Sequence, residues 1–465
     1  MENDIVNDDY KRQELKYKEL TEKPVEKLVA KMAVPTIISM LTTSFYNMAD
    51  TFFVSKINTQ STAAVGIVFS MMAVIQAIGF FFGHGSGTYI SIKLGAKDTA
   101  EASKMAATGF VSSIIIVGLF ILIFGIIFIK PLAYILGSTE TILPYSIEYM
   151  KYILIGAPYM TALLVLNNQL RLQGNAIFAM VGLITGAITN IILDPILIFT
   201  FSMGIKGAAI GTIISQFIGF CILLVGTNVW GTLPINLRDF SPSFQKYKAI
   251  IAGGLPSLCR QSIASVSTML LNTAAGPFGD AAIAAISIVN RVAMFTNSAV
   301  IGFGQGFQPV CGFNYGAKKY DRVIKAYYFC IKISTIILLI FSSIIFINAF
   351  HIAMSFNDKD ALLVEIASRT LRYQALTIPL WGLITLSSMI LQTTRKTFRA
   401  SLLAVSKQGL FLIPVIFMLP RFFGLTGIET AQPVADFLTF LLSIPLGYSI
   451  IREMKLEVKN SAKIV

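Results

Sequence analysis

Two aspartates stand inside long apolar stretches of the sequence, where ionisable side chains are rare. Asp50 follows Tyr46 by four residues and Asp194 follows Asn190 by four, so in a helix each carboxylate shares a face with a polar neighbour. A charge in the middle of a membrane-spanning helix costs roughly 2.5–3.5 kcal/mol, and such residues mark ion or substrate pathways. Carboxylate and amide oxygens suit Na⁺, and a buried carboxylate can instead carry a proton. We therefore predict a coupling site for Na⁺ or H⁺ at these two residues.

Other polar residues fall near the same depth. Each aspartate lies about 17 residues beyond the start of its apolar stretch, which corresponds to roughly 25 Å along a helix. Thr212 lies close to this level in a third stretch, and Tyr149 lies near the same end of a fourth. The alternative is that each aspartate only hydrogen-bonds locally and stabilises packing. The expected ion site is Asp50, Asn190, Asp194 and Thr212, with Tyr46 beside it.

Two prolines lie in the same stretches as the aspartates. Pro195 directly follows Asp194 and removes the hydrogen bond to the carbonyl of Ile191, which frees an oxygen next to the predicted site. Pro35 has the same effect near the start of the first stretch. Both are candidate bend points.

The elements that must position these residues are membrane-spanning helices. Of the 465 residues, 55% are hydrophobic and 13% are charged, whereas soluble domains carry roughly a quarter charged residues. Apolar runs of about 20 residues are long enough to cross the hydrocarbon core. We place twelve of them, at 33–54, 62–82, 107–129, 147–167, 177–200, 207–228, 249–272, 281–302, 326–350, 371–391, 400–420 and 430–451. The expected fold is an all-α integral membrane protein with about twelve transmembrane helices.

The basic residues predict the orientation. The net charge of +13 is spread over short breaks between apolar runs rather than gathered in one patch, which argues against nucleic-acid binding. Lys and Arg concentrate before the first run and in alternate breaks, which favours a cytoplasmic position for these segments and for both termini. The N-terminal tail, 1–32, is expected not to be a secretory signal, because its first 31 residues are charged and lack an apolar core. The expected cytoplasmic segments are 1–32, an inter-lobe linker at 230–248 and a C-terminal tail at 452–465.

The two halves of the chain repeat each other. A shift of 221 residues aligns Pro35 with Pro256, and Gly95-Ala-Lys97 with Gly316-Ala-Lys318; Gly204 and Gly424 match after a slip of one residue. Six spans per half predict two parallel six-helix lobes, 33–229 and 249–451, with a substrate pathway between them. Asp50 aligns with Leu271, and Asp194 with the apolar segment 413–415. The acidic pair is therefore expected in the N-lobe only.

Basic, aromatic and methionine side chains supply candidates for a substrate cavity. Arg260 could line the cavity or reach the inner surface. Arg291 is expected to face the inter-lobe cavity or to pair with a carbonyl, and Lys407 is a further basic residue inside a span. Soft and aromatic side chains adapt to varied ligands, although at helical spacing most of them are core or lipid-facing. The candidates are Phe45, Met48, Met72, Tyr149, Arg260, Gln261 and Arg291.

The sequence contains no motif for nucleotide binding or catalysis. No phosphate-binding Gly-x-x-x-x-Gly-Lys-Ser/Thr motif occurs, and no catalytic or metal cluster is spaced for an enzyme. We expect no enzyme activity, no nucleotide partner and no cofactor besides the coupling ion. His84, in a glycine-rich stretch, is interpreted as a turn residue rather than a proton relay. The four cysteines are interpreted as packing residues.

The motifs resemble those of the MATE (multidrug and toxic compound extrusion) transporters, in particular the MepA-type branch close to the DinF group. They are Tyr-Asn-x-x-Asp-Thr at 46–51, Gln-Gly-Asn at 173–175, Asn-x-x-x-Asp-Pro at 190–195, Gly-x-x-Gly-Ala-Ala at 204–209, Pro-Ser-x-x-Arg-Gln at 256–261 and Gly-Phe-Asn-Tyr-Gly-Ala-Lys at 312–318. The resemblance implies a monomeric plasma-membrane antiporter that exports cationic or amphipathic drugs in exchange for Na⁺ or H⁺. It also implies an ion site at Asp50, Asn190, Asp194 and Thr212. Spans seven and ten carry acids in the NorM branch but none at mid-membrane here.

Two alternative functions differ in class from drug export. A flippase for lipid-linked oligosaccharides shares the superfamily fold, but such proteins often have fourteen spans and a cationic cavity. A membrane scaffold or receptor would need neither buried acids at matched depth nor a twofold repeat.

Overall fold

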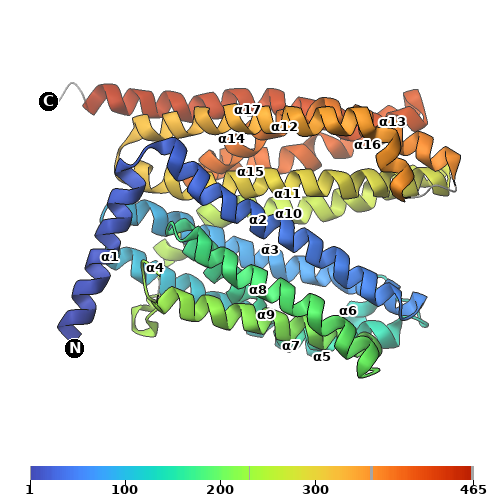
Figure 1. Cartoon of the computed structure of the whole chain (residues 1–465), viewed down its shortest axis with the longest axis horizontal. Coiled ribbons are helices and arrows are strands. Elements are labelled where there is room, and N and C mark those ends of the chain that lie inside the picture. Colours follow the sequence, from blue (N-terminus) through green and yellow to red (C-terminus); the bar gives the residue numbers. More distant parts are fainter. Residues whose placement is uncertain (1, 230, 357–359, 462–465) are drawn as a thin grey trace.

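The computed structural model describes residues 2–229, 231–356 and 360–461, and every regular element in these ranges is helical. Figure 1 shows two bundles side by side, one from the blue to green half of the chain and one from the yellow to red half. The N-lobe consists of α2 (Val25–Ser55), α3 (Thr59–Gly95), α4 (Thr99–Ser112), η1 (Ser113–Gly118), α5 (Leu119–Ile127), α6 (Ile129–Ile135), α7 (Leu143–Leu172), α8 (Ala176–Pro195), η2 (Ile196–Thr200) and α9 (Gly204–Val229).

The C-lobe repeats this order. It consists of α10 (Phe244–Ala275), η4 (Gly276–Phe278), α11 (Asp280–Gly316), α12 (Tyr320–Phe356), α13 (Ala361–Thr377), η5 (Ile378–Leu380), α14 (Trp381–Thr393), α15 (Thr397–Val405), η6 (Ser406–Leu410), α16 (Leu412–Phe423) and α17 (Leu425–Ser461). Two elements lie outside the lobes, α1 (Glu2–Glu22) and η3 (Leu237–Asp239) in the linker.

The helices have the length and composition of membrane spans. Eleven helical segments among the described residues are long and apolar enough to cross a membrane. The 32-residue α10, which covers the seventh expected span, is more polar and completes the set of twelve. The expected all-α membrane fold in two lobes is confirmed. Several helices extend beyond the apolar runs, since α2 already begins at Val25 and α17 continues to Ser461.

Equivalent turns of the two lobes share unusual backbone angles. Lys97 and Lys318 have φ of 60° and 57°, and Gly204 and Gly424 both have φ of 56°. These pairs stand at the same offsets as the sequence repeat. A left-handed conformation at a lysine is uncommon, so its recurrence shows that the repeat reproduces the backbone as well as the residue types.

The outer ends of α1 and α17 lie at one end of the bundle in Figure 1. The turns that hold Lys97, Lys318 and Arg395 lie at this end too, because Lys97 and Lys319 contact Tyr17 of α1 and Arg395 contacts Tyr89 of α3. We call this the basic end. The α1 helix lies across it and contacts both lobes: Lys16 donates to the Gly174 carbonyl (3.2 Å), and Asn314 donates to the Leu20 carbonyl (2.9 Å). Partial burial opposes ionisation of Glu19 in α1, but hydrogen bonds from Lys31 and Lys16 prevail and lower its pKa to about 2.

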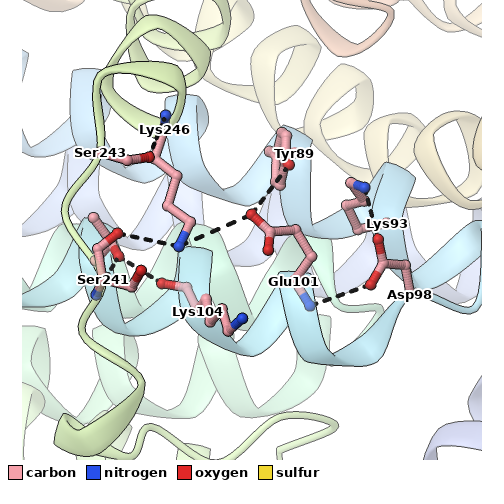
Figure 2. A network of polar contacts seen from close by, with 9 residues as sticks. Tyr89, Lys93, Asp98, Glu101, Lys104, Ser241, Ser243 and Lys246 are labelled. Carbon is pink, nitrogen blue, oxygen red and sulfur yellow. Dashed lines mark hydrogen bonds and ion pairs between the residues drawn. The ribbon is translucent and has the colours of Figure 1, made fainter.

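The linker between the lobes is fastened to α3 and α4 by polar contacts (Figure 2). Lys246 donates to the Ser241 carbonyl (3.1 Å) and lies 3.9 Å from Glu101, which in turn accepts from the Tyr89 hydroxyl (3.5 Å). The Ser241 amide donates to Thr108 (3.3 Å). These contacts fix the start of α10 against the N-lobe.

The two lobes contact each other closely at the basic end through glycines. A Cβ at Gly85 of α3 would lie 2.3 Å from the Ile250 carbonyl oxygen of α10, and one at Gly306 of α11 would lie 2.4 Å from the Ala33 Cα of α2. Toward the opposite end, α2 slopes away from α11 in Figure 1. The lobes are therefore sealed at the basic end by close backbone contact.

This seal predicts the effect of enlarging Gly85. Gly85→Leu should lower the free energy of unfolding by about 1–3 kcal/mol, because the new side chain must displace backbone of the other lobe. The measurement is thermal or denaturant unfolding of the purified protein in detergent. The matched control is Gly66→Leu in the same helix, where a Cβ meets no atom within 4 Å. Equal stability of the two variants would show that the lobes do not pack as described.

Candidate ion and substrate site

The two predicted aspartates meet inside the N-lobe. Asp50 on α2 and Asp194 on α8 are 8% and 0% exposed, and their carboxyl groups lie close enough to interact directly. The Asn190 side-chain amide, one turn before Asp194, donates to Asp194 Oδ1 (3.0 Å). As the spacing of four residues predicts, the Asn190 amide and the Asp194 carboxylate lie on the same face of α8.

The local structure around Asp194 explains how an acid fits among packed helices. α8 ends at Pro195 and continues as the wide turn η2, which extends over Ile196–Thr200. On the facing helix α9, Gly211 leaves room for the carboxylate, because a Cβ there would lie 2.5 Å from Asp194 Oδ1. Proline and glycine thus shape the space that the acid occupies.

Hydroxyl and amide groups from two further helices complete the cluster. Thr212 of α9 and Tyr149 of α7 are fully buried, and Tyr46 of α2 is 7% exposed. The hydroxyls of Tyr46 and Tyr149 lie near Thr212, but the Thr212 and Tyr149 hydroxyls form no hydrogen bond. Gln216, one turn beyond Thr212, lines the same small cavity as Tyr46. The sequence analysis did not include Gln216, although its position four residues after Thr212 predicts that both side chains lie on the same face of α9.

Several oxygens of this cluster have no hydrogen-bond partner. The buried atoms without a partner include Asp50 Oδ1, Asn190 Oδ1, Asp194 Oδ2, Thr212 Oγ1 and the Tyr149 hydroxyl. Buried polar atoms are normally satisfied, so a group of such atoms in one place indicates a missing partner. A set made only of oxygens suits Na⁺ or a proton rather than a soft metal. Within the described residues, no three His, Cys, Asp or Glu side chains are placed to hold a metal together.

A small cavity adjoins the cluster. It has a volume of about 80 Å³ and is lined in part by Tyr46, Gln76, Asn167 and Gln216, with apolar side chains between them. This is well below the roughly 300–1,000 Å³ of sites for drug-sized ligands. In this conformation the N-lobe cavity has room for an ion and water.

The residues predicted to line a substrate cavity are scattered. Phe45 and Met48 are exposed on α2, and the Phe45 ring lies 5.3 Å from that of Phe295 in the other lobe. Met72 is buried in the apolar core of the N-lobe. In the C-lobe, Arg291 is exposed, Gln261 is half-buried, and Arg260 donates to the Ser257 hydroxyl (3.4 Å). Only Tyr149 of this set reaches the acidic cluster.

His84 lies inside α3, so its interpretation as a turn residue is wrong. The helix continues through the glycine-rich stretch because these glycines permit close contact with α7 and α10. The His84 ring contacts the Arg171 guanidinium (3.2 Å) and the Ser257 hydroxyl (3.3 Å). Arg171, 1% exposed, also donates to the Gln305 carbonyl of the other lobe (2.7 Å). This polar contact between the lobes was not predicted, because its members are far apart in the sequence.

The C-lobe also contains buried acids, which the sequence analysis did not identify. Asp436 and Glu429 of α17 are 0% and 1% exposed. Glu429 accepts two hydrogen bonds from Arg369 (2.6 and 2.8 Å), and Asp436 lies 3.6 Å from the Lys407 ammonium. The repeat alignment missed both because it compared only the positions that match Asp50 and Asp194. A search of the twelfth span for acids would have found Asp436.

Comparisons with known proteins agree with this architecture. The family model MatE matches residues 35–196 and 256–418, one segment in each lobe. The chain is 28% identical to multidrug export protein MepA of Staphylococcus haemolyticus over 92% of this chain and 94% of that protein. It is 29% identical to MepA of Staphylococcus aureus, over 91% and 94% respectively.

Solved structures show the same fold. An outward-facing multidrug resistance MATE transporter of the MOP superfamily has a TM-score of 0.89 and 26% identity, covering 94% of this chain and 98% of that one. A MOP superfamily transporter from Pyrococcus furiosus, whose binding pocket is described as having reversed polarity, has a TM-score of 0.88 at the same identity and coverage. The match of the family model to both lobes shows that this chain is a member of the MATE family.

Proposed function

We propose that this protein is a secondary antiporter that exports cationic or amphipathic drugs in exchange for Na⁺ or H⁺. The observation that carries the proposal is the pair of buried carboxyl groups, Asp50 and Asp194, surrounded by oxygens without partners. The names of the MepA relatives support multidrug export. No feature of the comparisons favours a flippase.

The electrostatics of the pair supply a mechanism for exchange. Two carboxylates in a low-dielectric interior repel each other and lose hydration, so an empty site is unfavourable. Na⁺ or a proton relieves this repulsion, and so does a cationic drug that approaches the N-lobe cavity. If ion and drug stabilise different arrangements of α2 and α8, the binding of one favours release of the other. Pro35, inside α2, is a candidate position for the rearrangement.

The lobe contacts support a transport cycle by alternating access. The lobes are sealed at the basic end by close glycine contacts such as Gly85 with Ile250. We infer that this conformation faces outward, with the basic end in the cytoplasm and the protein in the plasma membrane as a monomer. Export then requires separation of the lobes at the basic end, which breaks these contacts and those of α1.

The coupling role of the aspartates can be tested by neutral substitution. Asp50→Asn and Asp194→Asn should each reduce gradient-driven efflux of a fluorescent cation by at least about 100-fold, because the coupling ion loses a carboxylate ligand. The protein should remain folded, since each substitution removes a charge from the membrane interior. The assay uses proteoliposomes with an imposed Na⁺ or pH gradient. Asp280→Asn, at an exposed acid of α11, is the matched control. Leu271→Asp should not rescue either variant, and near wild-type efflux by both Asn variants would refute the site.

The proposed orientation can be tested by labelling single cysteines in a cysteine-free background. Asn236→Cys, exposed in the linker, should react with an impermeant maleimide only from the cytoplasmic side. Ser202→Cys, exposed at the opposite end, should react only from outside. Reversed accessibility of the two positions would overturn the orientation.

A further inference from the structure

The C-lobe contains a carboxylate with many donors. Asp436 is fully buried, and its Oδ2 accepts from Trp381 Nε1 (2.7 Å), Gln374 Nε2 (2.9 Å) and Thr377 Oγ1 (3.4 Å). Its Oδ1 accepts from Gln432 Nε2 (2.9 Å). Four neutral donors from α13, α14 and α17 therefore orient this carboxyl group.

The cation next to this carboxylate is an amino-acid side chain. The Lys407 ammonium lies 3.6 Å from Asp436 Oδ1 and 3.8 Å from the centroid of the Trp381 ring. A carboxylate next to an indole face is a typical recognition site for organic ammonium ions. A lysine side chain has the chemistry of a butylammonium group on a tether, so its contacts here are those that an organic ammonium ion would make.

The Lys407 side chain is held by an irregular part of its helix. It projects from the wide turn η6, Ser406–Leu410, and 19% of the side chain is exposed. A wide turn inside a helix often marks a functional site. The side chain is thus partly exposed and is attached to an irregular turn of its helix.

The repeat places this cluster at the position of the N-lobe cavity. At the offset of 221 residues, Trp381 corresponds to Met160 and Lys407 to Gly186. At the offset of 220 that relates Gly424 to Gly204, Asp436 corresponds to Gln216. Met160, Gly186 and Gln216 all line the N-lobe cavity. The same region of the repeat therefore holds a cavity in the N-lobe and the Lys407–Asp436 ion pair in the C-lobe.

Packing alone does not account for the charged pair. Buried ion pairs contribute little to stability compared with apolar residues of the same volume, because both charges lose hydration. Ionisable residues inside membrane spans usually serve ion or substrate pathways. The acid and base of this pair belong to different helices of the lobe, α17 and the η6 turn.

We propose that Asp436, Trp381 and Gln374 form a second cation-binding subsite, for the nitrogen- or phosphorus-centred cation of a lipophilic substrate. Lys407 is the tethered cation that occupies this subsite until substrate displaces it. The inference rests on the proposed function only in taking lipophilic cations as the ligand class. It concerns binding, so it can hold even if the coupling ion or the direction of transport is different.

Displacement of Lys407 would reach the interface between the lobes. The Gln408 carbonyl in the same turn accepts from Ser267 of α10, and Gly409 packs against Ile263 of that helix. α10 also contacts the N-lobe, where Gly253 adjoins Gly85. A substrate that moves the η6 turn would therefore act on a helix that holds the lobes together.

The test uses the fluorescence of Trp381. The sequence has two tryptophans, so Trp230→Phe leaves Trp381 as the only reporter in the full-length protein. In this background Lys407→Ala vacates the subsite, and n-butylammonium should bind with a saturable change in fluorescence, at least about tenfold more tightly than to the parent. Tetraphenylphosphonium should show the same preference. Adding Asp436→Asn should abolish both signals, and Lys407→Arg should behave like the parent.

Each outcome bears on the proposal. No saturable signal in Lys407→Ala, or equal binding with Asp436→Asn added, would overturn the subsite. Binding of n-butylammonium without tetraphenylphosphonium would overturn the substrate role and leave a structural ion pair. If Lys407→Ala does not fold by circular dichroism, the comparison is between the parent and Asp436→Asn, which should bind tetraphenylphosphonium about tenfold more weakly. Binding without gradient-driven efflux would refute the proposed function and leave the subsite standing.

Discussion

Two carboxyl groups that face each other inside an apolar lobe cannot both remain charged without a neutralising cation. This constraint explains the local structure around Asp50 and Asp194. Pro195 ends the regular part of α8, Gly211 leaves space on α9, and Thr212 presents an oxygen without a partner. Each of these features would be unfavourable in an ordinary packed helix pair. Together they keep a space with the chemistry of a hard-cation or proton site in the middle of the N-lobe.

The two lobes repeat one fold but satisfy their buried acids in different ways. In the N-lobe, the acids are left with unpartnered oxygens beside a cavity. In the C-lobe, Asp436 is paired with Lys407 and with four neutral donors. A lobe with an exchangeable cation and a lobe with a tethered one would respond differently to an ion gradient. The glycine contacts at the basic end link the lobes, so a change in either one can act on the same interface.

The sequence predicted the fold and most of the N-lobe cluster for physical reasons. Apolar length determines the spans, the repeat determines the lobes, and helical spacing places Asn190 with Asp194 and Tyr46 with Asp50. Thr212 and Tyr149 could be added to the predicted cluster because they lie at nearly the same depth along their helices as the aspartates. These inferences need only distances along a helix.

The remaining contacts depend on packing between helices, which a single sequence does not specify. The partners of Arg171 are His84 on α3 and Gln305 on α11. Asp436 gathers donors from α13, α14 and α17. Met72 has the residue type of a cavity-lining side chain but faces the core. Residue type alone could not distinguish these cases, because the rotation of each helix about its axis decides what a side chain meets.

The most direct measurement of the central claim is the dependence of substrate affinity on the coupling ion. The dissociation constant of tetraphenylphosphonium is measured by equilibrium dialysis on the purified wild type and on Asp194→Asn, across a series of Na⁺ concentrations and a series of pH values. Linkage requires that an ion exchanged for substrate weakens substrate binding. The account predicts that either added Na⁺ or lowered pH weakens wild-type binding by about tenfold or more, whereas Asp194→Asn no longer responds to that ion. A wild-type affinity that is independent of both ions, or an unchanged response in Asp194→Asn, would contradict it.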